Sequence, residues 1–234
     1  MHDAEKRNAG KRAADLIRDG TVLGLGTGST VLFAVERLKS RIADGLDLTA
    51  VPTSYQAAMR AREAGIRLTT LDEHPAIDAT IDGADQVDCN LRLIKGRGAA
   101  HTREKCVAAA SARLIIAVDP SKLVDELNAP VPLEVLPFAH RPVVARITAM
   151  GGYPLLREGV RKDGPVITDN GNFIVDAHFG PIPDPGSLEA ALEAIPGVVA
   201  AGLFSGFTEK TTVIIGEADG SRSLGCSPDQ ENIR

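Results

Sequence analysis

The chain has 234 residues, of which 31 are acidic and 26 basic, so its formal charge is −5. This balance argues against a surface for nucleic acid or for an anionic membrane, because either surface needs a basic excess to meet phosphates. With 44% hydrophobic and 24% charged residues the chain can bury a core, and glycine, at 23 residues, exceeds its usual share of roughly 7%.

The first twenty residues mix acidic and basic side chains and lack the apolar stretch of a secretory signal. Elsewhere the apolar runs stay far short of the ~20 residues that a membrane-spanning helix needs. The three cysteines, Cys89, Cys106 and Cys226, have no C-x-x-C spacing, so neither a disulfide framework nor a zinc site is expected. A reducing cytoplasm is the compartment that these features favour.

Up to residue 129, short apolar runs alternate with helical patterns. The apolar spacing over residues 29–39 predicts a helix with Ser29 or Thr30 as its N-cap, and Thr53 or Ser54 is expected to cap a second helix that reaches residue 64. Strands are predicted over residues 21–25, 49–51, 66–71, 79–82, 91–95 and 113–118. This alternation indicates a mostly parallel sheet with helices on its faces.

Proline marks a change of composition near residue 130. Ten of the fourteen prolines fall between Pro130 and Pro196. The predicted order there is a strand, a helix, a strand, a strand, a helix and a strand, over residues 133–136, 140–150, 166–169, 173–177, 188–195 and 198–203. Asn170-Gly171 predicts a hairpin, Ser187 is expected to cap the second helix, and the order suggests a small α+β layer of the split βαβ type.

A last buried strand is predicted over residues 211–216, where the chain can return to the first sheet. The domains are therefore expected to comprise residues 1–129 plus 205–234, with residues 130–204 as an insertion. The polar residues 219–234 are expected to be frayed.

The first candidate site is the segment from Gly24 to Thr30, GLGTGST, which joins a strand to a helix. Glycines let backbone N–H groups approach a ligand, and the helix N-terminus and the hydroxyls of Thr27, Ser29 and Thr30 favour an anion such as a phosphate. The segment is neither a Walker A loop nor a G-x-G-x-x-G fingerprint. Its alternative interpretation is a tight turn whose hydroxyls cap the helix.

Three further segments carry charged residues after strands or at a helix start. Asp82-Gly83-Ala84-Asp85 either faces a ligand crevice or forms a turn, and Asp88 is expected to be solvated. Lys95-Gly96-Arg97-Gly98 can meet a phosphate or stabilise an oxyanion. Thr102-Arg103-Glu104-Lys105 is either part of the site or an ion-paired first turn. Because all four segments are expected at strand ends of one parallel sheet, they should share an edge.

The five histidines contain no H-E-x-x-H and no close pair, and the chain has no G-x-S-x-G elbow. Metal catalysis and a serine hydrolase are therefore not expected. His101 either lines the crevice or belongs to the neighbouring surface.

In this order the four segments resemble ribose-5-phosphate isomerase of the A type. The resemblance continues through residues 118–122, 132–135, 166–172, 195–198 and 202–204, and reaches about Gly220. It implies a Rossmann-like sheet with a small ferredoxin-like α+β insertion, assembled as dimers or tetramers. It also implies interconversion of ribose 5-phosphate and ribulose 5-phosphate in the pentose phosphate pathway, with no metal or other cofactor.

The resemblance assigns a role to each matching residue. Glu104 corresponds to the catalytic base, Lys95 to the lysine that stabilises the oxyanion, and Asp82 and Asp85 to acids that face the sugar. The residues expected to bind substrate are Lys6, Thr27, Gly28, Ser29, Thr30, Gly83, Ala84, Gly96, Arg97, Gly98 and Lys122.

One position departs from the family pattern, which usually has Lys-Gly-Gly-Gly where this chain has Arg97 at the middle glycine. If that position needs a positive φ, arginine costs on the order of 1 kcal/mol of strain.

Two other functions stay open at this stage. One is a sensor module that binds a sugar phosphate without chemistry, and the other is an amino-sugar-phosphate deaminase. The retained Glu104 and Lys95, and the lack of a recognisable DNA-binding segment in the chain, favour the isomerase over the sensor. The four motifs together fit the isomerase better than the deaminase.

Overall fold

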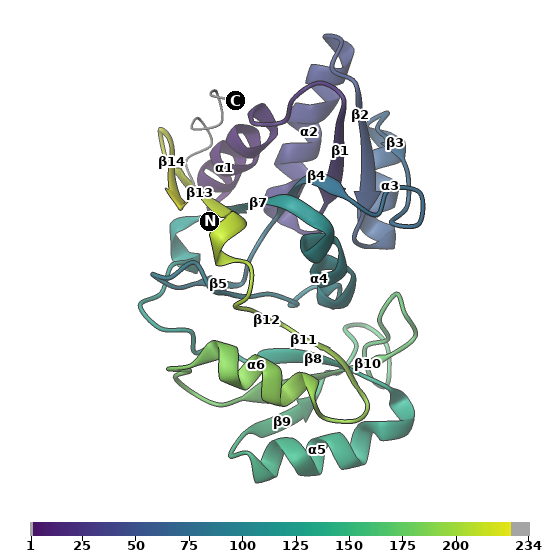
Figure 1. Cartoon of the computed structure of the whole chain (residues 1–234), viewed down its shortest axis with the longest axis vertical. Helices are drawn as coiled ribbons and strands as arrows, with labels where there is room; N and C mark the ends of the chain where they lie inside the picture. The colour runs from purple at the N-terminus through teal and green to yellow at the C-terminus, as the bar shows by residue number, and fades with distance from the viewer. Residues whose placement is uncertain (1, 226–234) are drawn as a thin grey trace. The chain divides into compact units, whose positions relative to one another are not determined.

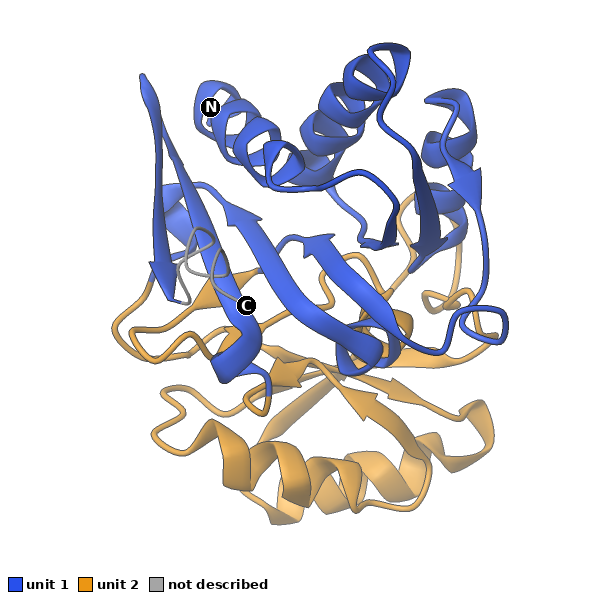
Figure 2. Cartoon of the chain, turned by 45° about the horizontal axis from the view of Figure 1, so that its top comes forward, with its two compact units in different colours: residues 1–84, 106–123, 207–234 blue, residues 85–105, 124–206 orange. Residues whose placement is uncertain are grey.

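The computed structural model describes residues 2–225, and the chain forms two compact units (Figure 2). Unit 1 comprises residues 1–84, 106–123 and 207–234, and unit 2 comprises residues 85–105 and 124–206. These units differ from the domains expected from the sequence chiefly in residues 85–105, and the expected domain limits stay a prediction.

The centre of unit 1 is a seven-stranded sheet in the order β14-β13-β7-β4-β1-β2-β3 (Figure 1). Its strands are β1 (Thr21–Leu25), β2 (Leu48–Pro52), β3 (Arg67–Leu68), β4 (Ile77–Asp82), β7 (Ser111–Val118), β13 (Thr211–Glu217) and β14 (Gly220–Gly225). Every pair is parallel except β13 with β14. The mostly parallel sheet predicted from the sequence, with the return of the chain at β13, is confirmed.

Helices cover the sheet of unit 1, and its strands bury apolar residues on both faces of the sheet. The helices are α1 (Asp3–Asp15), α2 (Ser29–Ala43), α3 (Tyr55–Glu63) and α4 (His101–Ala110), of which α4 begins in unit 2. Leu23 and Leu25 of β1 pack into the core shared with α1 and α2, whereas Val22 packs with Val107 of α4. Alternating residues of one strand therefore serve two cores, as expected for a buried parallel strand.

Helix α1 has no counterpart in the sequence-based expectations. Its buried residues are all small, namely Ala9, Gly10, Ala13 and Ala14, so large apolar residues do not mark its inner face. A Cβ atom at Gly10 would lie 2.6 Å from the carbonyl oxygen of Thr30. Small residues thus let α1 pack closely on α2, and the helix is recognised from this packing rather than from periodicity.

Unit 2 contains an antiparallel four-stranded sheet in the order β11-β8-β10-β9. Its elements along the chain are β8 (Val131–Val135), α5 (His140–Ala149), β9 (Tyr153–Leu156), β10 (Phe173–His178), α6 (Pro185–Glu193) and β11 (Val198–Ala201). The predicted order and the split βαβ layer are confirmed, since β10 lies between β8 and β9.

Two local predictions in unit 2 are wrong. Residues 166–169 form no strand but one isolated bridge, Ile167 with Phe173, and the strand that pairs with β10 is β9. The cap of α6 is Asp184, whose carboxylate accepts a hydrogen bond from the backbone N–H of Ser187. Helix α6 begins at Pro185, two residues before the predicted cap Ser187, because proline is favoured in the first turn of a helix.

The predicted strand over residues 91–95 is reduced to β6 (Leu93–Ile94). It lies in a separate antiparallel sheet between β5 (Gln86–Val87) and β12 (Leu203–Phe204). The expectation that all four site segments follow strands of one parallel sheet is therefore wrong. The segment after Lys95 is instead fixed by antiparallel pairing, because the Lys95 N–H donates to the carbonyl of Gly202 at 2.8 Å.

The expectation that residues 219–234 are frayed is wrong for residues 220–225. Residues 220–225 pair with β13 over six positions and are not frayed. Residues 226–234, including Cys226, lie outside the described residues.

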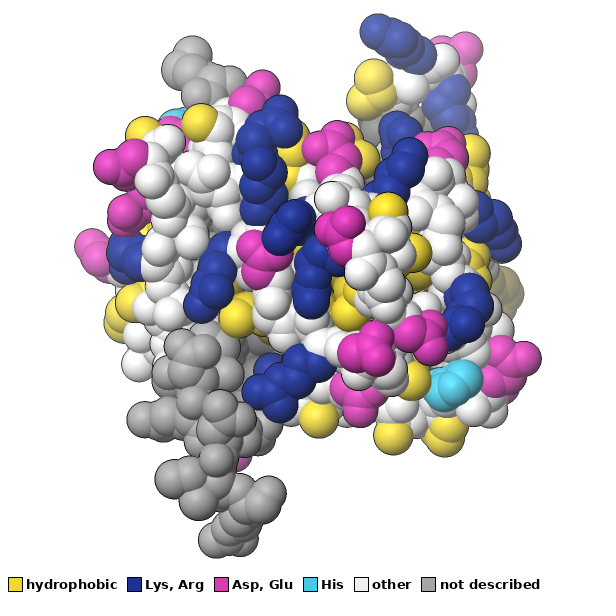
Figure 3. Space-filling view, turned by 90° about the horizontal axis from the view of Figure 1, so that it is seen from above, with side chains coloured by type: hydrophobic (Ala, Val, Ile, Leu, Met, Phe, Trp, Pro, Cys, Tyr) yellow, Lys and Arg dark blue, Asp and Glu magenta, His cyan; other side chains and the backbone are white. Residues whose placement is uncertain are grey.

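Basic and acidic side chains lie side by side on the face of unit 1 that Figure 3 shows from above. Between α1 and α2, Arg37 pairs with Asp15 at 2.7 Å and Arg7 with Glu36 at 3.8 Å.

Within residues 2–225, no helix combines the length and the apolar character needed to cross a membrane.

The contact between α1 and β13 gives a stability prediction. A Cβ atom at Gly216 would lie 1.7 Å from the carbonyl oxygen of Glu5, so Gly216→Ala forces α1 away from the sheet. We expect the free energy of unfolding to fall by about 1–3 kcal/mol in urea denaturation. Gly220→Ala is the matched control, because a Cβ atom there meets no neighbour and the change should stay within ~0.5 kcal/mol. Equal stability of the two variants would contradict the packing described here.

Candidate active site

The glycine loop of unit 1 leads from β1 into α2. The N-cap of α2 is Gly28, with a φ of 125°, and not Ser29 or Thr30 as expected. No side-chain hydrogen bond caps α2, and Gly28 and Ser29 are exposed. The helix thus begins at exposed residues and no hydroxyl caps its positive end, which favours anion binding over the alternative of a self-capped turn.

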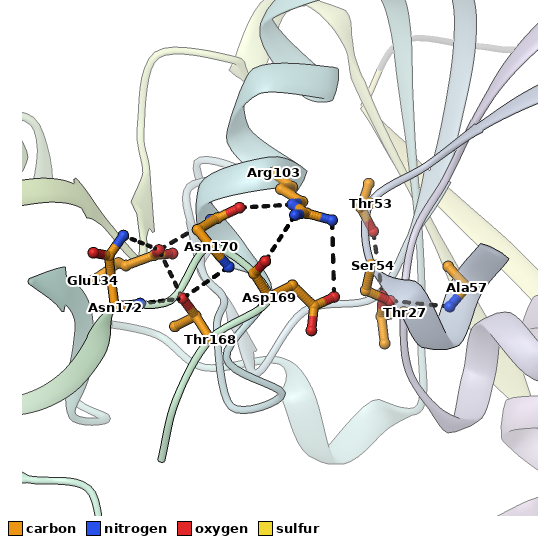
Figure 4. A network of polar contacts seen from close by, with 10 residues as sticks. All are labelled: Thr27, Thr53, Ser54, Ala57, Arg103, Glu134, Thr168, Asp169, Asn170 and Asn172. Carbon is orange, nitrogen blue, oxygen red and sulfur yellow. Dashed lines mark hydrogen bonds and ion pairs between the residues drawn. The ribbon is translucent and has the colours of Figure 1, made fainter. Parts of the chain in front are cut away.

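Hydroxyl groups tie this loop to the start of α3 (Figure 4). The hydroxyl of Thr27 lies 2.6 Å from that of Ser54 and 3.2 Å from that of Thr53. Ser54 in turn accepts the backbone N–H of Ala57 at 3.0 Å, so the predicted cap of α3 is confirmed. Because its hydroxyl is engaged inside the protein, Thr27 holds the shape of the loop. A cavity of about 250 Å³ opens beside the loop and reaches Gln56 and Arg60.

Asp82 ends β4 directly beside this loop. The N–H of Gly26 donates to the carbonyl of Ile81 at 2.9 Å, and a Cβ atom at Gly26 would lie 2.1 Å from Oδ1 of Asp82. Asp82 is 1% exposed, and its carboxylate accepts a hydrogen bond from the N–H of Gly83 at 2.8 Å. Glycine at position 26 thus leaves the space that the Asp82 carboxylate occupies.

Two lysines of unit 1 belong to the expected phosphate set. Lys6 lies in α1 and is half-buried, and Lys122 ends a 3₁₀ turn, also half-buried. Asp119 caps this turn by accepting the N–H of Ser121 at 3.0 Å. Burial raises the pKa of Asp119, but the hydrogen bonds from Ser121 outweigh burial and lower its pKa. Asp119 therefore stays ionised and holds the turn that carries Lys122.

Lys95 and Glu104 form a buried ion pair in unit 2. Nζ of Lys95 lies 3.1 Å from Oε2 of Glu104, and the two residues are 3% and 5% exposed. Lys95 also lies over the ring of Phe204, with Nζ 5.5 Å from the centroid. The partner of Glu104 thus comes from outside its own helix. A carboxylate that can accept a proton stands next to a cation that can stabilise negative charge.

The loop after Lys95 has two residues with positive φ, Gly96 at 110° and Ala99 at 59°. Arg97 is not among them, so the condition under which arginine would be strained at this position is not met. Arg97 is exposed, and its N–H donates to Oδ2 of Asp85 at 2.9 Å. Asp85 therefore supports the loop after Lys95. Gly98 is exposed, and a Cβ atom there would meet no neighbour.

The first turn of α4, which carries Glu104, is held by contacts that the sequence analysis did not identify. Arg103 donates to Oδ1 of Asn170 at 2.7 Å and to the carbonyl of Asp169 at 2.9 Å (Figure 4). Lys105 pairs with Glu189 at 2.5 Å and with Glu193 at 2.6 Å. The Asn170-Gly171 signal located the turn that receives Arg103, but no local pattern indicated its partner.

A buried glutamate organises that turn. Glu134, with no exposed surface, accepts hydrogen bonds from Thr168, Asn170 and Asn172 at 2.9, 2.9 and 2.7 Å. Burial raises the pKa of Glu134, but the hydrogen bonds from Thr102 and these three residues lower it overall. Glu134 is therefore an ionised anchor of the turn.

Two expectations about neighbouring residues are wrong. Asp88 is 3% exposed rather than solvated, and its carboxylate accepts a hydrogen bond from Nε of Arg92 at 2.6 Å. His101 has no exposed surface, and its Nε2 donates to the carbonyl of Ala200 at 3.2 Å. Burial lowers the pKa of His101 to about 4, so its imidazole is neutral at pH 7.

Among residues 2–225, no three His, Cys, Asp or Glu side chains are grouped so that they could hold a metal ion. The absence of a cofactor stays a prediction.

Comparisons with known proteins agree with the resemblance found in the sequence. A family model described as ribose 5-phosphate isomerase A (phosphoriboisomerase A) matches residues 49–220. The chain is 58% identical over 226 residues to ribose-5-phosphate isomerase A of Methanoregula boonei, with 97% of this chain and 95% of the relative covered. It is 54% identical over 218 residues to the protein of that name from Methanosarcina acetivorans, with 93% and 92% covered.

Solved structures confirm the fold class. The structure of ribose 5-phosphate isomerase A from Methanocaldococcus jannaschii matches with a TM-score of 0.91 at 42% identity, covering 97% of this chain and 100% of that one. A structure of D-ribose-5-phosphate isomerase in complex with phospho-erythronic acid matches with a TM-score of 0.90 at 45% identity, covering 94% and 97%.

The buried His101 gives a prediction about pH. Its pKa is lowered in the folded chain, so the unfolded chain binds more protons between pH 6.5 and about 4, and stability falls as pH falls through this window. Between about pH 7 and about pH 5 we expect His101 to account for a loss of about 2 kcal/mol in the free energy of unfolding. His101→Gln should remove that part of the slope, whereas His178→Gln, at an exposed position, should retain it. An unchanged slope in His101→Gln would contradict the assignment.

Proposed function

Because the chain belongs to the ribose 5-phosphate isomerase A family, we infer that it is an enzyme that interconverts ribose 5-phosphate and ribulose 5-phosphate. The observation that carries this proposal is the buried pair of Lys95 and Glu104, 3.1 Å apart. A module that merely binds a sugar phosphate has no need of a buried base next to a cation. The isomerase therefore explains this pair better than the sensor does.

The reaction moves one carbon-bound proton. From the aldose, Glu104 removes the proton on C2 while the C1 carbonyl oxygen becomes the negative oxygen of an enediolate. Glu104 then returns the proton to C1, the hydroxyl proton of O2 is transferred to O1, and the oxygen on C2 becomes the carbonyl of the ketose. One carboxylate that reaches both carbons suffices, so the step needs no metal or organic cofactor.

Lys95 acts when Glu104 takes up the proton. In the resting pair the ammonium of Lys95 faces the carboxylate of Glu104, and protonation of Glu104 removes this negative charge. The ammonium is then best stabilised by the charge that develops on the substrate oxygen. Its interaction with substrate is therefore stronger in the transition state than in the ground state, which is the condition for catalysis.

Asp82 and Asp85 are assigned to the hydroxyl protons of the sugar and to the opening of its furanose ring. Asp85 uses Oδ2 to hold the N–H of Arg97, and we assign its other oxygen to the substrate. Gly83, Ala84, Gly96 and Gly98 would let backbone approach the sugar.

The phosphate group is assigned to the loop from Gly26 to Thr30. The uncapped N-terminus of α2 supports this assignment, together with the hydroxyls of Ser29 and Thr30. Lys6 and Lys122 would add positive charge. Binding of the phosphate supplies energy remote from the reacting carbons and holds them in register.

We further propose that the enzyme works in the cytoplasm as a homodimer or homotetramer and serves the non-oxidative pentose phosphate pathway. This rests on the family membership.

Glu104→Gln tests the base. The amide cannot accept the carbon-bound proton, so kcat of the folded variant for ribose 5-phosphate should fall by about 10²–10⁴-fold. In deuterated water the wild-type protein should place deuterium on the exchangeable carbon, and the variant should not within the same time. Glu209→Gln, an exposed carboxylate of unit 1, is the control and should keep full activity. Near wild-type isomerisation by Glu104→Gln would exclude this base.

Ser29→Ala tests the phosphate loop. Loss of one hydrogen bond to the phosphate should raise KM for ribose 5-phosphate by about tenfold and change kcat far less, because the lost contact is made equally in ground and transition states. Steady-state kinetics measure both constants, with Ser40→Ala in the exposed part of α2 as the control. A fall in kcat at constant KM would move Ser29 from substrate binding to the chemical step.

A further inference from the structure

Arg157, which follows β9, bridges two parts of unit 2. Its Nε donates to Oδ2 of Asp176 at 2.7 Å, and its Nη2 donates to Oδ1 of the same carboxylate. Its Nη1 donates to the carbonyls of Gly96 and Arg97, each at 3.0 Å. One guanidinium thus joins a carboxylate of β10 to the backbone that follows Lys95.

Arginine suits this place for a geometric reason. The planar guanidinium offers one edge for bidentate binding of a carboxylate and keeps two further N–H groups on Nη1 for two carbonyls. The side chains of Arg157 and Asp176 are 18% and 21% exposed, so the pair is largely shielded from water. Lysine has no comparable fork and cannot make all four bonds at once.

The partner Asp176 is itself fixed by the sheet. It lies opposite Leu155 in the pairing of β10 with β9, and the N–H of Arg157 donates to the carbonyl of Ile174 at 2.9 Å. The backbone of Arg157 also accepts the N–H of Val166 at 2.8 Å. The guanidinium is therefore presented from ordered strands.

Other hydrogen bonds also support the loop after Lys95. The N–H of Lys95 donates to the carbonyl of Gly202, the N–H of Arg97 to the carboxylate of Asp85, and the N–H of Ala99 to the carbonyl of Gly96 at 2.9 Å. The last of these closes a turn within the loop and does not join it to another strand. Gly96 has a φ of 110°. Because glycine adopts positive and negative φ values about equally readily, its own backbone preference does not hold the loop in this conformation. The carbonyl bonds from Arg157 thus fix the peptide units on both sides of Arg97.

We propose that Arg157, oriented by Asp176, is a positioning residue that holds the loop after Lys95 and so aims the Lys95 ammonium at the developing oxyanion. The inference rests on the proposed function of Lys95. Because Asp176 balances its charge, Arg157 acts through hydrogen bonds and geometry rather than by adding positive charge to the site.

Kinetics of Arg157→Ala provide the first test. Misplacement of a catalytic group by about 1 Å can cost up to about 10²-fold in rate, so kcat should fall at least about tenfold while KM for ribose 5-phosphate changes less than about threefold. Arg157→Lys should retain part of the activity. Guanidinium ion at about 10–50 mM should bind where the side chain is missing in Arg157→Ala and should raise the kcat of that variant. Arg146→Ala, on the exposed face of α5, is the matched control and should behave as wild type.

A double-mutant cycle separates positioning from general stabilisation. If Arg157 acts through Lys95, adding Arg157→Ala to Lys95→Ala should lower kcat by less than about twofold further, although it costs at least about tenfold in the wild-type background. A purely structural role would lower both backgrounds alike and would also lower Tm in proportion.

The outcomes distinguish this inference from the proposed function. If folded Arg157→Ala keeps kcat within about twofold of wild type, or if its effect multiplies fully with that of Lys95→Ala, Arg157 does not position Lys95. If folded Lys95→Ala isomerises at the wild-type rate, the proposed function of Lys95 fails instead.

Should Arg157→Ala not fold, Asp176→Asn provides the deciding test, because this variant keeps the arginine but weakens the contact that orients it. A lower kcat at unchanged KM in Asp176→Asn supports the inference, and an unchanged kcat overturns it.

Discussion

The buried ion pair of Lys95 and Glu104 is the interaction on which the site depends. Both charges are almost fully removed from water. Removal of either one would therefore leave the other buried without its partner, at a high cost in folding free energy. Such a pair adds little net stability, and its retention is better explained by chemistry than by folding. Much of the structure around it keeps the two groups in contact: antiparallel pairing places Lys95, and the anchored first turn of α4 places Glu104.

The glycine excess reflects a second constraint, which is space for polar groups next to backbone. At Gly26 a side chain would occupy the position of the Asp82 carboxylate, and at Gly202 it would lie 2.2 Å from the carbonyl of Lys95. At Gly28 the requirement is instead a positive φ, where the chain turns into α2. These glycines are therefore needed for different physical reasons, although the sequence shows them as one compositional excess.

Local patterns predicted much of the fold and the type of each candidate residue. The longer parallel strands β7 and β13 contain apolar runs, and the order of elements in unit 2 was correct even where strand limits were wrong. Helix α1 was missed because alanine and glycine form its inner face, and the sheet that contains β6 was misassigned because two-residue strands carry no periodicity. The burial of His101 depends on residues ~100 positions away, such as Ala200, which no local pattern reveals.

The same distinction separates the chemistry of the site from its geometry. The groups proposed to touch substrate lie in short motifs, because a base, a cation and an anion-binding loop are recognisable by residue type and spacing. The groups that orient them come from distant strands and turns: Asn170 receives Arg103, and Arg157 reaches the loop after Lys95 only because β9 pairs with β10. A motif can therefore be complete while its lysine is misdirected, so contacts beyond the motif bear directly on the rate of the reaction.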